Sequence, residues 1–155
     1  MAGVAATYPI VWGVLQLFTG PLSDRIGRRI PIGVGMLLQA AALTSFSLTR
    51  QLVPAVMAAA VLGVGTALAY PALIAAAADI TPEHRQASAI GFFRMWRDAG
   101  YVAGALTFGA VADLWGLLAA AAAAAVVTAA SGMDVTLNLR QEHPGERLIA
   151  PTMSS

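Results

Sequence analysis

Two long stretches without a charged residue, separated by a short charged segment, limit what this chain can fold into. Residues 2–19 carry no charge, and neither do residues 30–49. A helix of about 20 apolar residues is long enough to cross the roughly 30 Å hydrocarbon core of a bilayer. Between the two stretches, residues 20–29 hold one acid, three arginines, two glycines and Pro21. Because glycine allows close backbone approach and proline discourages helix continuation, this segment predicts a tight charged turn between two membrane helices.

The composition of the whole chain also points to a membrane. Of the 155 residues, 58% are hydrophobic and 11% are charged, and the mean hydropathy is +0.72. Charged residues make up about 25% of a typical soluble domain, so this chain is too poor in charge to be one. We therefore predict an all-α membrane protein that is embedded in the lipid bilayer.

The same composition argues against several classes of function. The nine basic residues are all arginines. They are dispersed among apolar segments rather than gathered on one basic face, which argues against binding nucleic acid. The chain has no cysteine, so it offers no disulfide and no thiol nucleophile. Its two histidines, His84 and His143, lie far apart, which argues against an imidazole metal site. We expect no enzyme activity, no metal and no cofactor.

Five transmembrane helices are predicted from the apolar segments and the polar turns between them. They are expected at residues 3–19, 31–48, 54–78, 82–112 and 117–133. Thr81 is a favourable N-cap and Pro82 suits the first helical position, so we expect the fourth helix to begin there. Residues 1–134 form the predicted transmembrane domain, and residues 135–155 form a polar cytoplasmic tail that we expect to be disordered.

The charged segment has a weaker copy further along the chain. Residues 20–27 align with residues 109–116, 89 residues later, so that Asp24 matches Asp113. Three membrane crossings lie between the copies, which places them on opposite sides, as in an inverted repeat. The second copy has leucines where the first has Arg25, Arg28 and Arg29. Because arginines are retained on the cytoplasmic side, we predict a plasma-membrane protein with its N-terminus outside and its C-terminus in the cytoplasm.

The charged segment resembles the signature cytoplasmic loop of the major facilitator superfamily, a family of secondary transporters. Its residues follow the spacing of that loop in the order Gly20-x-Leu22-Ser23-Asp24-Arg25-x-Gly27-Arg28-Arg29. A second pattern is similar to the C-terminal half of the family and runs Tyr70-Pro71, Asp79, then Arg94-x-x-Arg97-Asp98-x-Gly100-Tyr101-x-x-Gly104. The resemblance extends to about Met133.

This resemblance implies a fold and a function. The five helices would correspond to helices eight to twelve of a twelve-helix transporter, within a six-helix half bundle. A small-molecule substrate would bind between two halves that open to one side of the membrane at a time. The N-terminal half and the seventh helix have no counterpart here, so we expect a fragment that pairs with a missing half and is not active alone. The alternative is a helical membrane protein that scaffolds or binds a partner without moving a solute.

The gating residues are also assigned by the resemblance. Asp24 and the arginines of its loop are expected to hold the inner face closed by engaging helix ends and a neighbouring carboxylate, for which Asp79 is the candidate. The loop residues concerned are Gly20, Asp24, Arg25, Gly27, Arg28 and Arg29.

A group of charges is expected near the start of the fourth helix. Counting about 20 residues back from Asp113 places the inner membrane boundary just before Arg94. Arg97 and Asp98 then lie just inside the membrane, where an arginine can still reach the interface. Together with Asp79, these residues form the predicted inner-face charge network. Two interpretations stay open, namely a network that stabilises a gate and direct contact with an anionic substrate or a proton.

A polar stripe runs along the first helix. Tyr8, Trp12 and Gln16 recur at every fourth position and therefore share one face. Such side chains prefer protein or water to lipid. With Tyr70 and Tyr101 they are candidates for lining a substrate cavity, and packing between helices is an equally good explanation of the stripe.

Overall fold

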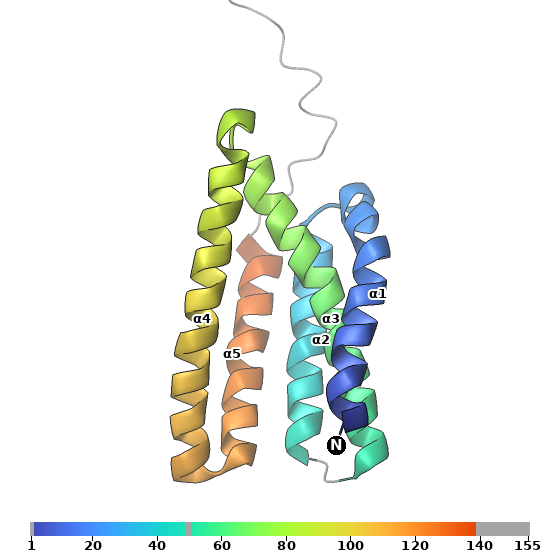
Figure 1. Ribbon diagram of the computed structural model, residues 1–155, viewed down its shortest axis with the longest axis vertical. Coiled ribbons are helices and arrows are strands. Elements are labelled where there is room, and N and C mark those ends of the chain that lie inside the picture. Colours follow the sequence, from blue (N-terminus) through green and yellow to red (C-terminus); the bar gives the residue numbers. More distant parts are fainter. Residues whose placement is uncertain (1, 49–50, 139–155) are drawn as a thin grey trace, which may run out of the picture.

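The computed structural model describes residues 2–48 and 51–138, and these fold into long α-helices that lie side by side along one axis (Figure 1). The elements are α1 (Ala2–Ile26), α2 (Arg29–Leu48), α3 (Leu52–Asp79), the short 3-10 helix η1 (Glu83–Arg85), α4 (Gln86–Trp115) and α5 (Leu117–Asn138). No strand is present in these ranges. The predicted all-α class with five long helices is confirmed.

Three helices are long and apolar enough to cross a membrane by length and composition, namely α2, α3 and α5. In α4, two arginines and two aspartates lower the hydropathy, so it does not belong to this set. That α1 and α4 also cross the membrane stays a prediction.

Small residues allow the helices to pack at close range. α2 lies at the centre and packs against both α3 and α5, whereas α1 packs on α3 and hardly touches α2. A methyl group added to Gly35 would lie 2.5 Å from the carbonyl oxygen of Gly65, and one added to Gly65 would lie 2.6 Å from that of Gly35. The backbones of α2 and α3 are therefore in direct contact. On the other side of α2, Gly132 of α5 faces Met36 with similarly little room. Glycine at such crossings gains packing that a larger side chain would prevent.

The charged segment contains less of a turn than predicted. α1 continues through Gly20 and Pro21 to Ile26, so the expectation that Pro21 ends the helix is wrong. Proline inside a membrane helix is tolerated where another group satisfies the backbone carbonyl that it frees. Pro71 of α3 is such a case, because the Thr19 hydroxyl donates at 2.5 Å to the carbonyl of Ala67, four residues before this proline. A methyl group on Gly20 would meet nothing within 4 Å, so this glycine does not serve a close approach.

The start of α4 also differs from the prediction. The Thr81 hydroxyl donates back to the carbonyl of Ala77 at 2.8 Å and does not cap the next helix. Residues 83–85 form η1, and α4 begins only at Gln86. At the other end of the chain, α5 continues to Asn138, four residues beyond the predicted end of the transmembrane domain at residue 134. The rest of the predicted tail lies outside the described residues.

The internal repeat is visible in the backbone. Gly27 and Gly116 occupy matching positions of the two copies, and they are the only described residues with a positive φ, at 85° and 87°. Each forms a short link between two long helices, and the two links lie at opposite ends of the bundle (Figure 1). Only glycine adopts such a φ without strain, which explains why both copies keep it.

Candidate functional site

Arg28 connects the ends of two helices that are distant in sequence. It lies in the link between α1 and α2, and its Nε donates to Oδ2 of Asp79, the last residue of α3, at 3.0 Å. Its Nη1 donates to the Asp24 carboxylate and, at 2.9 Å, to Oγ of Ser23. Asp24 and Asp79 are both more exposed than Arg28, whose side chain is 23% exposed. One guanidinium therefore holds α1 and α3 together at this end of the bundle.

The electrostatics of this contact keep Arg28 charged. Burial by itself lowers the pKa of the guanidinium, but the hydrogen bonds and negative charges of Asp24 and Asp79 outweigh that effect and raise the pKa above its ordinary value. Charge-assisted hydrogen bonds of this kind are stronger than those between neutral groups.

Ser23 and Thr19 are two contributors that sequence reasoning missed. Ser23 is 1% exposed. Its hydroxyl accepts from Arg28 and donates to the carbonyl of Gly20 at 2.9 Å, so it helps to orient the arginine. Thr19 is also buried and ties α1 to α3. Both continue the polar stripe of Tyr8, Trp12 and Gln16 at helical spacing, and the signal would have been found had the helix been extended past Gly20.

The other two loop arginines have no such role in the described residues. Arg25 is exposed and Arg29 is half-buried. Neither side chain makes a hydrogen bond or ion pair with another residue of the ranges that the structure describes.

The second group of charges centres on Arg97 of α4. Its Nε lies 2.9 Å from Oδ1 of Asp98, its Nη2 lies 2.8 Å from the same oxygen, and its Nη1 donates to the Tyr70 hydroxyl on α3. Arg94 is exposed and is not paired with any described residue. The structure thus joins Arg97 to Asp98, leaves Arg94 outside, and places Asp79 with Arg28 instead. Arg97 is thus the arginine that contacts both its neighbour Asp98 and, through Tyr70, α3.

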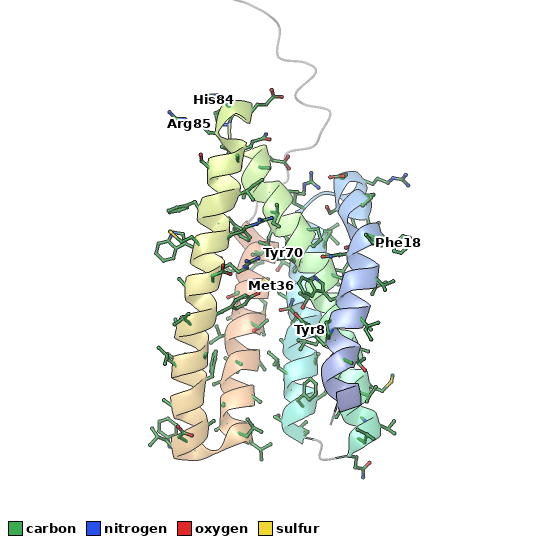
Figure 2. The ribbon with its side chains drawn as sticks, in the orientation of Figure 1. Tyr8, Phe18, Met36, Tyr70, His84 and Arg85 are labelled. Carbon is green, nitrogen blue, oxygen red and sulfur yellow. The ribbon has the colours of Figure 1, made fainter. Side chains whose placement is uncertain are left out.

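Aromatic rings extend this group across three helices. Tyr8 and Trp12 of α1 are stacked with centroids 6.1 Å apart, and the Trp12 ring meets Tyr70 edge to face at 6.0 Å. Arg97 Cζ lies 5.4 Å from the Tyr70 ring centroid and 5.8 Å from that of Tyr101. Four of the five predicted cavity residues are therefore joined by a chain of ring contacts that leads from α1 through α3 to Arg97 on α4; Tyr8 and Tyr70 are labelled in Figure 2. We call Tyr8, Trp12, Tyr70, Arg97, Asp98 and Tyr101 the aromatic–arginine cluster.

Two polar groups of this region lack a partner among the described residues. The indole Nε1 of Trp12 is buried and has no acceptor there. Gln16, the fifth predicted cavity residue, is half-buried, and its side chain makes no hydrogen bond to another described residue.

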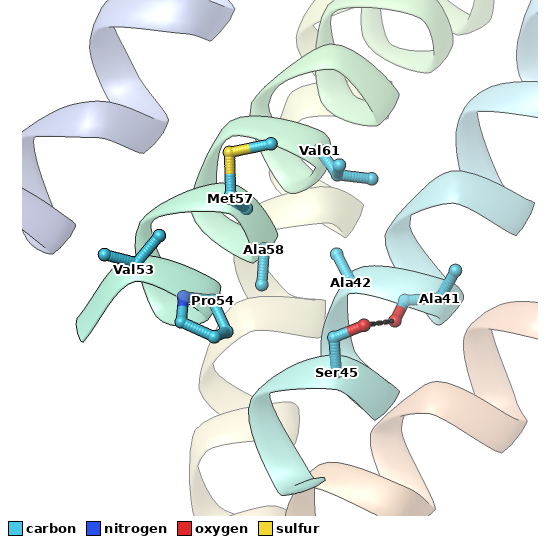
Figure 3. A pocket seen from close by; sticks show the side chains of 8 residues that line it. All are labelled: Ala41, Ala42, Ser45, Val53, Pro54, Met57, Ala58 and Val61. Atoms are coloured by element: carbon cyan, nitrogen blue, oxygen red, sulfur yellow. Dashed lines mark hydrogen bonds between the residues drawn. The ribbon is translucent and has the colours of Figure 1, made fainter. Parts of the chain in front are cut away.

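A separate pocket lies between α2 and α3, near the end of the bundle away from Arg28 (Figure 3). Its lining is apolar apart from one hydroxyl, and consists of Ala41, Ala42, Ser45, Val53, Pro54, Met57, Ala58 and Val61. The Ser45 hydroxyl donates to the carbonyl of Ala41 at 2.9 Å and is already used. This pocket shares no residue with the aromatic–arginine cluster and has no charge to orient a polar ligand. In the part of the chain that the structure describes, no three His, Asp or Glu side chains gather as a metal ion would require.

Comparison with known proteins assigns the chain to a family. The sequence profile of the Major Facilitator Superfamily matches residues 1–154. The uncharacterized MFS-type transporter YhjO of Bacillus subtilis is 34% identical over 92 residues, which cover 59% of this chain and 23% of that protein. Multidrug resistance protein D of Escherichia coli is 43% identical over 63 residues, which cover 41% of this chain and 16% of that protein.

A third relative is more distant. Quinolone resistance protein NorA of Staphylococcus aureus is 21% identical over 101 residues, which cover 65% of this chain and 26% of that protein. The chain thus spans about a quarter or less of the length of each of these relatives. No solved structure matches it. The profile match runs over nearly the whole chain and agrees with the motif of residues 20–29, and we conclude that the chain belongs to the Major Facilitator Superfamily.

Proposed function

We infer that this chain serves as the C-terminal half of a secondary transporter, which moves a small solute across the plasma membrane by alternating access. Membership of the Major Facilitator Superfamily supports transport rather than enzyme activity. The observation that carries the mechanism is the contact of Arg28 with Asp79, because it joins the ends of α1 and α3 at one side of the bundle.

The contact is suited to a gate. α1 packs on α3 and scarcely on α2, so a change at the α1–α3 contact moves α1 without disrupting the centre of the bundle. A contact shifts a conformational equilibrium only when it exists in one state and not in the other. When Asp79 separates from Arg28, Asp24 still pairs with the arginine from four residues away, so the guanidinium never loses both counter-ions. Separating Asp79 from Arg28 therefore costs little free energy, so this end can open and close reversibly.

The orientation follows from the arginines. Arg25, Arg28 and Arg29 lie at the same end of the bundle as Arg85, which Figure 2 labels. Under the positive-inside rule this end faces the cytoplasm, which places the N-terminus outside. The proposed partner is an N-terminal half, since the substrate site of such a transporter lies between two halves.

The proposal is tested by supplying that half. The chain is co-expressed with the N-terminal half of a related transporter, and accumulation of a fluorescent quinolone in cells is measured, because two of the relatives are named for drug resistance. We expect lower accumulation only when both halves are present. An Asp79→Asn variant should lose this effect, whereas Asp113→Asn, at the matching position of the second copy, should keep it. Stable association of the halves without transport of any solute in a broader panel would favour a scaffolding role instead.

A further inference from the structure

The aromatic–arginine cluster has unused hydrogen-bond donors. A guanidinium carries five N–H groups. At Arg97 the described residues engage Nε and one N–H of Nη2 through Asp98, and one N–H of Nη1 through Tyr70. One N–H on each Nη is left, and no other described residue accepts it. The Tyr70 hydroxyl accepts from Arg97, so its own proton is available for another acceptor.

Trp12 adds a donor of the same kind. Its Nε1–H can only donate, and it is buried without an acceptor. An unsatisfied buried donor of this type costs about 1–3 kcal/mol, so an acceptor that reached it would be favoured. The Trp12 ring packs against the rings of Tyr8 and Tyr70, and because these are side chains they can rotate to admit a ligand towards the indole N–H.

The balance of charge around the cluster is positive. α1 contributes only uncharged side chains there, and the acid at the end of α3, Asp79, is engaged with Arg28. α4 contributes Arg94, Arg97 and Asp98, which together carry one net positive charge. The carboxylate of Asp98 is already bound to Arg97. The one carboxylate that a cationic ligand would meet is already paired with Arg97 through its Oδ1, whereas an anion finds a guanidinium with free donors.

The cluster also presents a flat apolar surface. Tyr101 is 67% exposed, and one side of its ring lies near the Arg97 guanidinium. Aromatic rings pair with other rings through offset stacked or edge-to-face contacts. A ring that lies against Tyr101 can therefore carry an acidic substituent to Arg97.

We propose that the cluster selects a planar aromatic carboxylate as the transported solute. Arg97 binds the carboxylate in competition with Asp98, Tyr101 supports the ring, and Trp12 donates to the carboxylate or to a second acceptor. This assignment rests on the proposed transport function, since it names the solute of the same protein.

Binding of matched probes to the purified full chain in lipid nanodiscs tests the assignment without requiring transport. The probes are 2-naphthoate, 2-naphthamide and 2-naphthylmethylammonium, which share one ring system and differ in charge. We expect 2-naphthoate to bind at least about tenfold more tightly than the cation, the scale of one charge-assisted hydrogen bond. Because the result is a ratio measured on one protein, it does not depend on the absolute affinity.

Variants assign the effect to the cluster. Arg97→Gln should weaken 2-naphthoate binding about tenfold or more and abolish the preference for the anion. Tyr101→Leu alters an exposed residue, so it should fold normally, and it should weaken binding of all three probes alike. Trp12→Phe keeps the ring and removes the donor, and should weaken 2-naphthoate selectively. Trp96→Phe is the matched control, since Trp96 lies 62% exposed on α4 beside Phe92 and outside the cluster.

The outcomes separate this assignment from the proposed function. Equal or tighter binding of the cation, binding of none of the probes, or 2-naphthoate binding that is indifferent to both Arg97→Gln and Tyr101→Leu would overturn the assignment. Transport of another solute by the paired halves would then still support the proposed function. Selective 2-naphthoate binding without any transport would support the cluster as a binding site for an aromatic anion and would contradict the proposed function.

Discussion

Nε of Arg28, in the link between α1 and α2, lies 3.0 Å from Oδ2 of Asp79, the last residue of α3. The contact spans 51 residues of sequence and closes one end of the α1–α3 pair. At the other end of the bundle, the matching copy has Asp113 followed by leucines in place of the arginines, so no equivalent contact can form. The two ends of the repeat thus share a backbone turn and differ in their charges, so the gate that we propose involves only the Arg28 end.

The close approach of α2 and α3 predicts a large effect of one methyl group. Gly35→Ala places a carbon 2.5 Å from the Gly65 carbonyl oxygen, and the helices must move apart. Overpacking of this kind typically costs about 1–3 kcal/mol. We expect a clearly lower melting temperature in detergent. Gly109→Ala is the control, because a methyl group there meets nothing within 4 Å. Equal melting temperatures of the two variants would refute the direct backbone contact.

The two glycines of the repeat should respond alike to substitution. Gly27 and Gly116 both have a φ near 86°, within a degree. A residue with a Cβ in such a conformation is strained by about 1–3 kcal/mol. We expect Gly116→Ala and Gly27→Ala to lower thermal stability by similar amounts, while Gly91→Ala, in the helical interior of α4, does not. At Gly116 the cost is purely conformational, since nothing lies within 4 Å of the added methyl group.

The ion pair of Asp98 with Arg97 predicts a specific rescue. Asp98→Asn leaves the Arg97 guanidinium with Tyr70 but without its carboxylate, so the yield of folded protein in membranes should fall. A second change, Arg97→Gln, should recover part of the loss because it removes the uncompensated charge. Arg94→Gln should not recover the yield, since Arg94 makes no side-chain hydrogen bond or ion pair with Asp98 in the described residues. If Arg94→Gln restored the yield of folded protein in quantitative membrane blots, the partner of Asp98 would be Arg94, and the pairing with Arg97 would be wrong.

The orientation is open to chemical labelling because the chain contains no cysteine. Single cysteines at Trp115 and Gln51 should react in intact cells with a thiol reagent that cannot cross the membrane. A cysteine at His84, at the Arg28 end, should react only after the cells are opened. Reaction of the His84 position in intact cells would reverse the assigned topology.

The helices and the inverted repeat could be predicted from the sequence because both depend on local patterns. Charge-free segments delimit the helices, and the matching glycines, Gly27 and Gly116, could be aligned by eye. It also indicated Asp79 as the carboxylate near the loop arginines, although not that Arg28 would be the one to reach it. The helix boundaries near Pro21 and Thr81 were predicted wrongly. α1 continues through Pro21, and the Thr81 hydroxyl donates back to the carbonyl of Ala77 instead of capping the next helix.

The cluster around Arg97 illustrates the same limit. The sequence placed Arg94, Arg97 and Asp98 in one network without saying which arginine pairs with the acid, whereas in the structure Arg97 pairs with Asp98 and also reaches Tyr70 on another helix. Spacing along one helix cannot reveal that contact. Likewise, the stripe of Tyr8, Trp12 and Gln16 marked a face of α1, and only the fold shows that two of the three stack towards Tyr70.

The proposed gate requires that the contact of Arg28 with Asp79 breaks and re-forms during transport. Spin labels at Ile26 and Ile80, both exposed residues beside the contact, report the distance between the ends of α1 and α3 when the chain is paired with an N-terminal half in nanodiscs. If the contact is a gate, we expect two distance populations, a shift towards the longer one in Asp79→Asn, and no shift in Asp113→Asn. A single distance that is the same in the unmodified chain and in Asp79→Asn would contradict the gating role of this contact.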